Sequence, residues 1–227
     1  MLYNQVENEW GELTYVPTTL GNVLIVLLIL AALFLAMLFI KKRTQSKALS
    51  PRQLSFCAMS IALGTVLSMI KLFHFPTGGS ITLLSMLVIC LPGYWFGLEA
   101  GILTGIAYGL LQMLIDPYIL YPAQMVVDYL LAFGAMGLSG LFYKNKNGLI
   151  PGYITAVLGR YIFAVISGWI FFGTYAWEGW GALPYSLVYN AIYIFAEAVI
   201  TVILLFLPPV SSGMKRIKQL AAGNAEI

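Results

Sequence analysis

The stretch YGLLQMLIDPYILYPAQMVVDYLLAFGAMGLSGLF, residues 108–142, consists of two apolar segments joined by a short polar turn. The segment at 99–116 ends in the turn DPYILYP (116–122), and the segment at 122–141 follows it directly. An apolar helix of about 20 residues spans the hydrocarbon core of a bilayer. The stretch therefore predicts two antiparallel transmembrane helices, because so short a turn keeps consecutive helices side by side.

The composition of the whole chain agrees with this prediction. Hydrophobic residues make up 60% and charged residues only 9% of the 227 residues, whereas charged residues make up about 25% of a soluble domain. Both cysteines, Cys57 and Cys90, lie in apolar runs, and His74 is the single histidine. The chain is thus predicted to be an integral membrane protein without a disulfide, a metal site or a cofactor. It has no nucleotide-binding loop, which excludes an ATPase of its own.

Further apolar segments lie on both sides of the opening stretch, at 52–73, 82–97, 149–173 and 185–207, and a leading run covers 20–40. The predicted fold is all-α and membrane-embedded: a six-helix bundle preceded by one extra N-terminal transmembrane helix. The domain boundaries that follow are an extracellular N-terminal segment at 1–19, the additional helix at 20–40, a cytoplasmic linker at 41–51, the six-helix domain at 52–208 and a cytoplasmic tail at 209–227.

The basic residues gather on one side of this predicted bundle. With the N-terminus outside, all of them except Lys71 and Arg160 fall on the inner side: Lys41, Lys42, Arg43, Lys47, Arg52, Lys144, Lys146, Lys215, Arg216 and Lys218. Cytoplasmic loops carry such an excess of Lys and Arg. The distribution predicts a multi-pass protein of the plasma membrane with its N-terminus outside and its C-terminus in the cytoplasm.

Aromatic residues are concentrated in the predicted outer loops: Tyr118, Tyr121, Tyr175, Trp177, Trp180 and Tyr185. One interpretation is an interfacial aromatic belt, which many membrane proteins have. The other is a ligand site that opens to the outside. The last segment adds an i, i+4 series that runs through Tyr185, Tyr189, Tyr193 and Glu197, with Asn190 beside it.

The position of Asp128 favours the second interpretation, a ligand site, over an aromatic belt. Tyr121, Gln124 and Asp128 are spaced i, i+3 and i+7, so they share a helix face, and Asp128 lies roughly 9 Å below the outer end. Arg160 and Glu197 lie at equal depth in consecutive antiparallel helices, which predicts a structural ion pair between them. Asp128 is then left without a protein cation, and a cationic ligand held by this carboxylate and by aromatic faces is the simplest partner.

Ala58 and Ala62, in the first helix of the six-helix domain, have the small-xxx-small spacing that lets another helix approach closely in lipid. This spacing marks a candidate partner interface.

Three segments resemble the membrane-embedded S component of energy-coupling factor (ECF) thiamine transporters of bacteria: GGSITLLSM (78–86), the opening stretch, and GRYIFAVISGWIFFGTYAWEGWGALPYSLVYN (159–190). The resemblance covers roughly 50–208 and implies a six-helix S-component bundle that captures a vitamin and has no enzyme activity. It also implies docking onto a transmembrane coupling protein and two ATPase subunits, whose ATP hydrolysis drives uptake.

The resemblance further implies roles for individual residues. Ala58 and Ala62 would contact the coupling protein, and Asp128 and Tyr129 would form the acidic-Tyr pair that grips thiamine. Further ligand contacts would be Tyr118, Trp177, Tyr185 and Asn190, in addition to Tyr121 and Gln124 on the Asp128 face.

The sequence departs from the family pattern at two positions, where Ala164 replaces a histidine and Ser85 replaces a glutamate. Both changes remove polar groups from the expected pocket. An alternative ligand is therefore a related pyrimidine or thiazole compound, or another vitamin precursor, on the same fold. A less favoured alternative is an intramembrane enzyme that uses Asp128 with Glu197 or Arg160, but the expected depths differ by about 9 Å.

Overall fold

The computed structural model describes residues 2–7, 13–21, 23–24, 27, 49–75, 78–115, 118 and 120–223. Most of the extra transmembrane helix predicted over 20–40 and most of the linker at 41–51 lie outside these residues. The first elements are the paired strands β1 (Tyr3–Glu7) and β2 (Leu13–Pro17). The elements that follow are α2 (Pro51–Met69), β3 (Lys71–His74), β4 (Ser80–Thr82), α3 (Ser85–Phe96), α4 (Leu98–Ile115), α5 (Pro122–Met125), η1 (Val126–Leu131), α6 (Ala132–Gly134), η2 (Ala135–Phe142), α7 (Leu149–Phe171), η3 (Gly173–Tyr175), α8 (Ala182–Phe206) and α9 (Pro208–Ala222).

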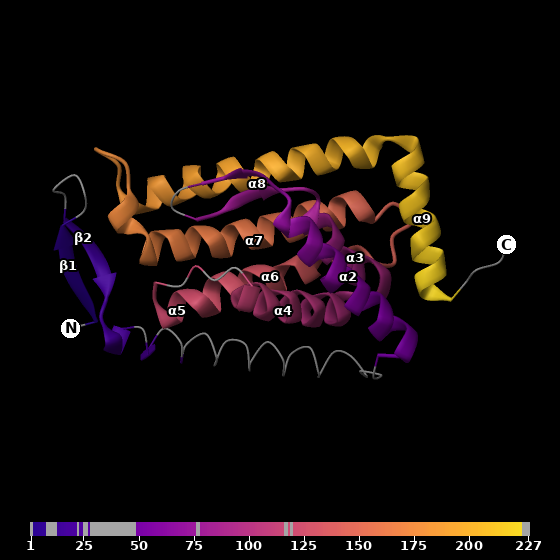
Figure 1. Ribbon diagram of the computed structural model, residues 1–227, viewed down its shortest axis with the longest axis horizontal. Helices are drawn as coiled ribbons and strands as arrows, with labels where there is room; N and C mark the ends of the chain where they lie inside the picture. The colour runs from indigo at the N-terminus through magenta and orange to yellow at the C-terminus, as the bar shows by residue number, and fades with distance from the viewer. Residues whose placement is uncertain are drawn as a thin grey trace.

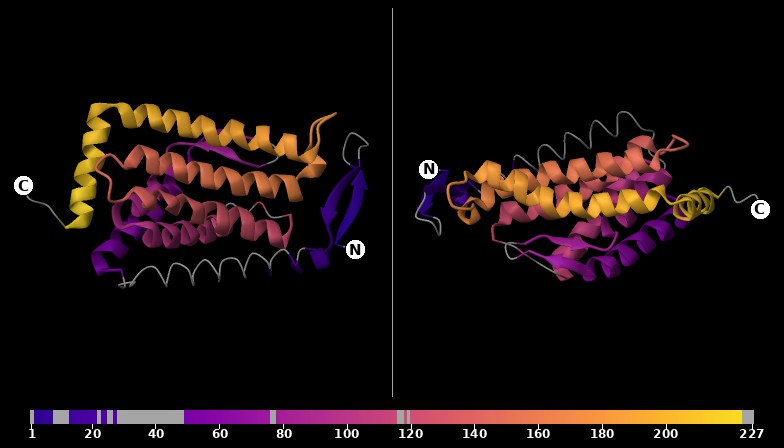
Figure 2. Two further views of the ribbon diagram at one scale, coloured as in Figure 1. Left: turned by 180° about the vertical axis from the view of Figure 1, so that it is seen from behind. Right: turned by 90° about the horizontal axis from the view of Figure 1, so that it is seen from above.

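The helices of the bundle run along its long axis, and α9 crosses one end nearly at right angles (Figures 1 and 2). Each of the six segments predicted within 52–208 contains a helix. The segment at 122–142 is continuous but irregular, because η1 is a π-helix and η2 is a 3-10 helix. Among the described residues, four helices are long and apolar enough to cross a membrane: α4, the helix over 122–142, α7 and α8.

The connection between α2 and α3 differs from the all-helical prediction. The segment at 52–73 was expected to be helical to its end, but α2 ends at Met69 and β3 pairs with β4 in an antiparallel hairpin. Gly78 and Gly79 form its turn with φ values of +92° and +83°, a conformation that residues with a Cβ rarely adopt. Helix α3 is short, with 12 residues. The residues shortly before it, Ser80–Thr82, form β4 of the hairpin instead.

Helices α3, α4 and η2 approach one another through glycines. A Cβ on Gly101 would lie 2.7 Å from Gly93 Cα and 2.8 Å from Gly137 Cα. A Cβ on Gly137 would lie 2.1 Å from the backbone nitrogen of Ile102. Small residues at such contacts let helix backbones approach closely in lipid, where the hydrophobic effect does not drive helices together.

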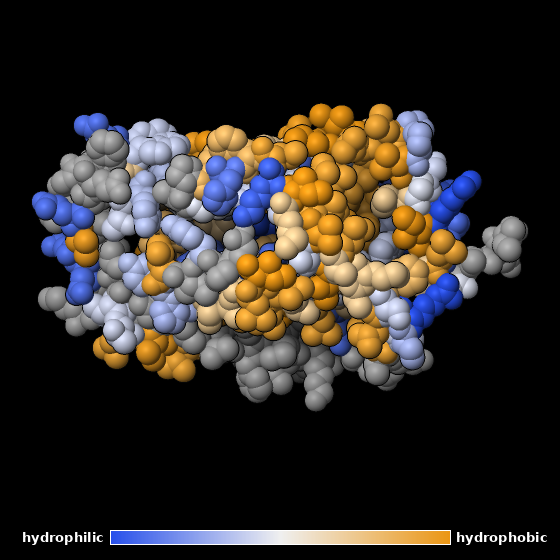
Figure 3. Space-filling model, in the orientation of Figure 1, coloured by the Kyte–Doolittle hydropathy of each residue, from blue (hydrophilic) through white to orange (hydrophobic). Residues whose placement is uncertain are grey.

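The predicted tail at 209–227 begins with a helix. One face of α9 packs against the core through Val210, Met214 and Ile217, while Lys215 and Arg216 are exposed. The Lys218 ammonium lies 3.9 Å from the centroid of the Tyr94 ring. Figure 3 shows apolar side chains gathered over the part of the bundle next to α9 and hydrophilic ones at both ends of the molecule. This surface is that of a multi-pass membrane protein.

Candidate functional site

A cavity of about 320 Å³ opens between the β3–β4 hairpin, η1 and the parts of α7 and α8 that lie farther from α9. Its volume lies at the lower end of the roughly 300–1,000 Å³ that is typical of small-molecule sites. The residues that line it come from all six predicted segments of the bundle and from the loops between them: from 68–112, Ser68, Lys71, His74, Gly78, Gly79, Ser80, Thr82, Ser85, Tyr108 and Gln112; from 118–133, Tyr118, Gln124, Asp128, Tyr129, Ala132 and Phe133; and from 160–193, Arg160, Ala164, Ser167, Gly168, Phe172, Tyr185, Ser186, Tyr189, Asn190 and Tyr193.

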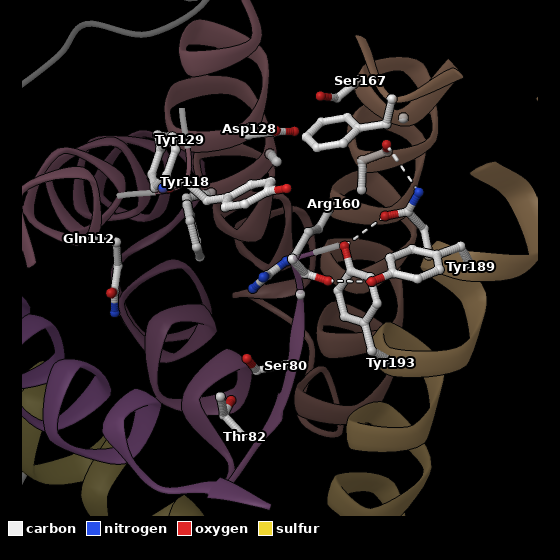
Figure 4. A pocket seen from close by; sticks show the side chains of 18 of the residues that line it. Ser80, Thr82, Gln112, Tyr118, Asp128, Tyr129, Arg160, Ser167, Tyr189 and Tyr193 are labelled. Atoms are coloured by element: carbon white, nitrogen blue, oxygen red, sulfur yellow. Dashed lines mark hydrogen bonds between the residues drawn. The ribbon is translucent and has the colours of Figure 1, made fainter. Parts of the chain in front are cut away.

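Asp128 lies in the wall of this cavity (Figure 4). Its Oδ2 atom accepts a hydrogen bond of 2.8 Å from the side-chain amide of Gln124. The same amide donates to the carbonyl of Tyr118 at 2.8 Å, and its oxygen accepts from the Leu120 N–H at 2.8 Å. Gln124 therefore fixes both the carboxylate and the loop before α5. In the described part of the chain, no basic group forms an ion pair with Asp128.

Arg160 and Glu197 do not form the ion pair expected from their equal depth. Between the described residues, Glu197 instead accepts hydrogen bonds from the backbone N–H groups of Thr82 (3.1 Å) and Met86 (3.0 Å), and from the Thr82 hydroxyl (2.6 Å). The guanidinium carbon of Arg160 lies 4.5 Å from the centroid of the Phe133 ring, and Figure 4 shows the side chain pointing into the cavity. The two charged groups do not meet even though their depths are similar, because Thr82 and Met86, on either side of the β4–α3 connection, are bonded to the Glu197 carboxylate.

Aromatic rings form two walls of the cavity. The rings of Tyr118 and Phe172 are stacked, with centroids 5.9 Å apart and an interplanar angle of 16°. On α8, the rings of Tyr185 and Tyr189 lie 5.3 Å apart, and Tyr193 follows at 6.1 Å from Tyr189. Partial burial raises the pKa of Tyr118, in the loop before α5, to about 12. Its phenol is thus neutral near pH 7.

The β3–β4 hairpin lies against these rings. The Tyr189 hydroxyl donates a hydrogen bond of 2.6 Å to the carbonyl of Gly78, and the Phe75 ring packs edge-on against Tyr189 at 5.7 Å. At the other end of the hairpin, Glu197 holds Thr82. The hairpin is therefore attached to α8 at both its turn and its base.

Six of the predicted ligand residues line the cavity: Tyr118, Gln124, Asp128, Tyr129, Tyr185 and Asn190. Tyr121 and Trp177 do not. Tyr121 precedes the helix in an extended conformation, so helical spacing does not apply to it, and its ring stacks on Phe171. Trp177 is 38% exposed and packs edge-on against Tyr185 outside the cavity.

Several lining residues were not singled out from the sequence, above all Ser167, Phe172 and the hairpin residues Gly78, Gly79, Ser80 and Thr82. A signal for Ser167 was present, since Arg160, Ala164 and Ser167 recur at i, i+4 and i+7 and so share one face of α7. The predicted interface residues Ala58 and Ala62 lie exposed on α2, away from the cavity.

Comparisons of the sequence and the fold with known proteins show the family of this chain. The family model described as thiamine transporter protein matches residues 54–216. The thiamine transporter ThiT of Bacillus subtilis is 37% identical over 163 residues, which is 66% of this chain and 81% of that protein. The solved structure of ThiT from Listeria monocytogenes superposes with a TM-score of 0.59 at 31% identity, covering 69% of this chain and 94% of that one. The chain belongs to the thiamine transporter protein family.

Proposed function

We propose that this protein is the thiamine-capturing S component of an ECF importer and that Asp128 is the counter-ion of the bound thiazolium ring. The observation that carries the proposal is the position of Asp128: it lines a cavity walled by tyrosines, and no described basic group forms an ion pair with it. A carboxylate within the membrane is costly unless it is compensated. A cationic heteroaromatic ligand compensates the charge and also stacks on the rings.

Calorimetric titration of the purified protein with thiamine tests the capture step. Thiamine is expected to bind, and Asp128→Asn is expected to weaken binding by about 100-fold, because a charge-assisted contact is worth roughly 2–3 kcal/mol. The matched control is Glu178→Gln, which removes the same charge from an exposed position outside the cavity. Equal affinity of the Asp128→Asn variant and the unmodified protein would contradict the proposal.

The uptake step depends on the exposed Ala58 and Ala62 of α2. In the proposed assembly these residues contact the transmembrane coupling protein, and two ATPases supply the energy. Ala58→Trp is expected to preserve thiamine binding but abolish ATP-dependent uptake in vesicles that contain the coupling protein and the ATPases. Leu158→Trp, at an exposed apolar position on α7, is the control. Normal uptake by Ala58→Trp would refute the docking assignment.

The proposed orientation puts the cavity mouth outside and α9 in the cytoplasm, because Lys144, Lys146, Lys215 and Arg216 are exposed at the α9 end. Both native cysteines are buried. In intact cells, an impermeant thiol reagent should label Glu178→Cys but not Gly213→Cys; the reverse pattern would invert the orientation.

The second candidate ligand is a related pyrimidine or thiazole compound, which the replacement of a family histidine by Ala164 in the cavity wall favours. Titration with the separate pyrimidine and thiazole halves of thiamine distinguishes the two. Thiamine should bind more tightly than either half if it is the ligand.

A further inference from the structure

We infer that Gln112 of α4 is a specificity-determining residue whose side-chain oxygen accepts a hydrogen bond from a hydroxyl group of the ligand. The inference rests on the proposed function. It assigns the hydroxyethyl arm of thiamine to the wall of the cavity that α2 and α4 form, opposite the tyrosines of α8.

The first observation is that Gln112 is buried with its oxygen unused. The side chain is 8% exposed and lines the cavity. Its amide nitrogen donates to the Ser68 hydroxyl at 2.6 Å and to the Tyr108 hydroxyl. Among the described residues, no group donates to the oxygen Oε1. This oxygen is not one of the described side-chain atoms that are fully enclosed without a partner, so it is open to the cavity.

The neighbouring hydroxyls determine which end of the amide faces the cavity. The Ser68 hydroxyl donates to the carbonyl of Thr65 at 2.8 Å, and the Tyr108 hydroxyl donates to the carbonyl of Gly64 at 3.4 Å. Each hydroxyl has one proton, so both are left as acceptors for the two N–H donors of Gln112. The reversed amide would set its oxygen against two oxygens whose protons are already used. The oxygen of Gln112 therefore points to the cavity.

On the opposite wall, α8 presents rings rather than an open acceptor of this kind. Figure 4 shows Gln112 on one side of the cavity and Tyr189 and Tyr193 on the other. The side-chain oxygen of Asn190 accepts from the Tyr193 hydroxyl at 2.7 Å, and the Asn190 amide donates to the carbonyl of Ser186 at 2.8 Å. This wall therefore suits stacking with a flat ring.

The two walls divide the groups of thiamine between them. In the proposed complex Asp128, which lies between the walls (Figure 4), is the counter-ion of the thiazolium ring. That ring carries the aminopyrimidine through one methylene and also carries the hydroxyethyl arm. The aminopyrimidine is the flat ring that can stack on the tyrosines, so the arm is left for the side of Gln112. Its hydroxyl supplies the proton that the amide oxygen needs.

This contact makes Gln112 selective for an arm with a proton to donate. An amide oxygen only accepts hydrogen bonds. A ligand without the hydroxyl leaves this buried oxygen unpaired, which is unfavourable. A site that is built to bind a hydroxyl rejects the analogue that lacks it for this reason.

The test is a titration cycle between one residue and one ligand group. The probes are thiamine, an analogue with an ethyl arm in place of the hydroxyethyl arm, and an analogue without the pyrimidine amino group. The unmodified protein is expected to bind the ethyl analogue about tenfold more weakly than thiamine. Gln112→Leu is expected to weaken thiamine and the analogue without the amino group about tenfold, but to bind the ethyl analogue as the unmodified protein does.

The cycle separates this role from a structural one. Gln112→Leu is expected to lower the melting temperature of the ligand-free protein, because the bonds to Ser68 and Tyr108 are lost. A purely structural loss would weaken all three ligands equally. The matched control is Thr104→Val on the same helix, since Thr104 is buried, donates to the carbonyl of Ala100 at 2.7 Å and lies outside the cavity. That variant is expected to keep the affinity for all three ligands.

Three results would overturn the assignment of Gln112. The first is equal affinity of the unmodified protein for thiamine and the ethyl analogue, a comparison that needs no variant to fold. The second is an equal loss for all three ligands in Gln112→Leu. The third is a loss confined to the two ligands with the amino group, because Gln112 would then contact the pyrimidine. Each leaves the proposed function intact as long as thiamine binds the unmodified protein, whereas absence of thiamine binding would defeat both.

Discussion

The two ends of the bundle are built in opposite ways. At the end near α9, helices α3, α4 and η2 are in backbone contact through glycines such as Gly101 and Gly137. At the other end, Gln112 of α4, Asp128 of η1 and the β3–β4 hairpin line the cavity, although α4 and η1 still meet closely at Gly109, whose Cβ would clash with the carbonyl oxygen of Tyr129. The difference shows how one bundle can be closed on one side of the membrane and hollow on the other.

The largest effect is expected where the closed end is tightest. Gly137→Val should prevent folding, because its Cβ would lie 2.1 Å from the backbone nitrogen of Ile102 and neither backbone can move without separating the helices. Overpacking alone costs about 1–3 kcal/mol and sometimes more. The measurement is the yield of monodisperse protein and its melting temperature. Gly213→Ala, with no atom within 4 Å of its Cβ position, is the control, and equal stability of the two variants would show that the glycine contact does not hold the helices together.

An intermediate effect is expected at the base of the hairpin. Glu197→Gln keeps the shape of the side chain but removes the charge that accepts from Thr82 and Met86. Charge-assisted hydrogen bonds contribute roughly 1.5–3 kcal/mol, so both the free energy of unfolding and the thiamine affinity should fall. Chemical unfolding and calorimetry measure the two quantities. A variant with unchanged stability would mean that the hairpin is held by its turn alone.

A smaller effect is expected at the turn of the hairpin. Tyr189→Phe removes the hydrogen bond to Gly78 but keeps the ring that packs against Phe75. A neutral hydrogen bond contributes about 1 kcal/mol, so thiamine should dissociate about fivefold faster in stopped-flow fluorescence. Tyr161→Phe, which removes a hydrogen bond to Leu187 outside the cavity, should leave the rate unchanged. Equal rates in both variants would show that the turn does not hold the ligand in.

The long apolar helices α4, α7 and α8 could be predicted from the sequence because a run of apolar residues is itself the signal for a membrane span. Lys71 to Phe73 were assigned to a helix, because β-pairing with Ser80 to Thr82 depends on a turn that hydropathy does not report. Asp128 could be identified because a carboxylate in an apolar segment is exceptional.

The other cavity residues could not be predicted in the same way. The position of a residue along a helix gives its depth in the membrane, but the rotation of the helix about its axis decides whether the side chain points into the cavity. Arg160 and Glu197 have similar depths, yet one contacts Phe133 and the other contacts the β4–α3 connection. Ser167 has no local signal as strong as that of Asp128, because a serine in an apolar helix is common. Its place in the cavity wall depends on packing between η1 and α7.

The most direct test of the account replaces the charge of the ligand rather than that of the protein. Thiamine and an uncharged analogue with a thiophene ring in place of the thiazolium have nearly the same shape. The unmodified protein is expected to prefer thiamine by about 100-fold, and Asp128→Asn is expected to lose most of this preference, since the charge-assisted contact is worth roughly 2–3 kcal/mol. Equal affinity of the unmodified protein for both ligands, or a preference that persists in Asp128→Asn, would contradict the role of Asp128 as the counter-ion.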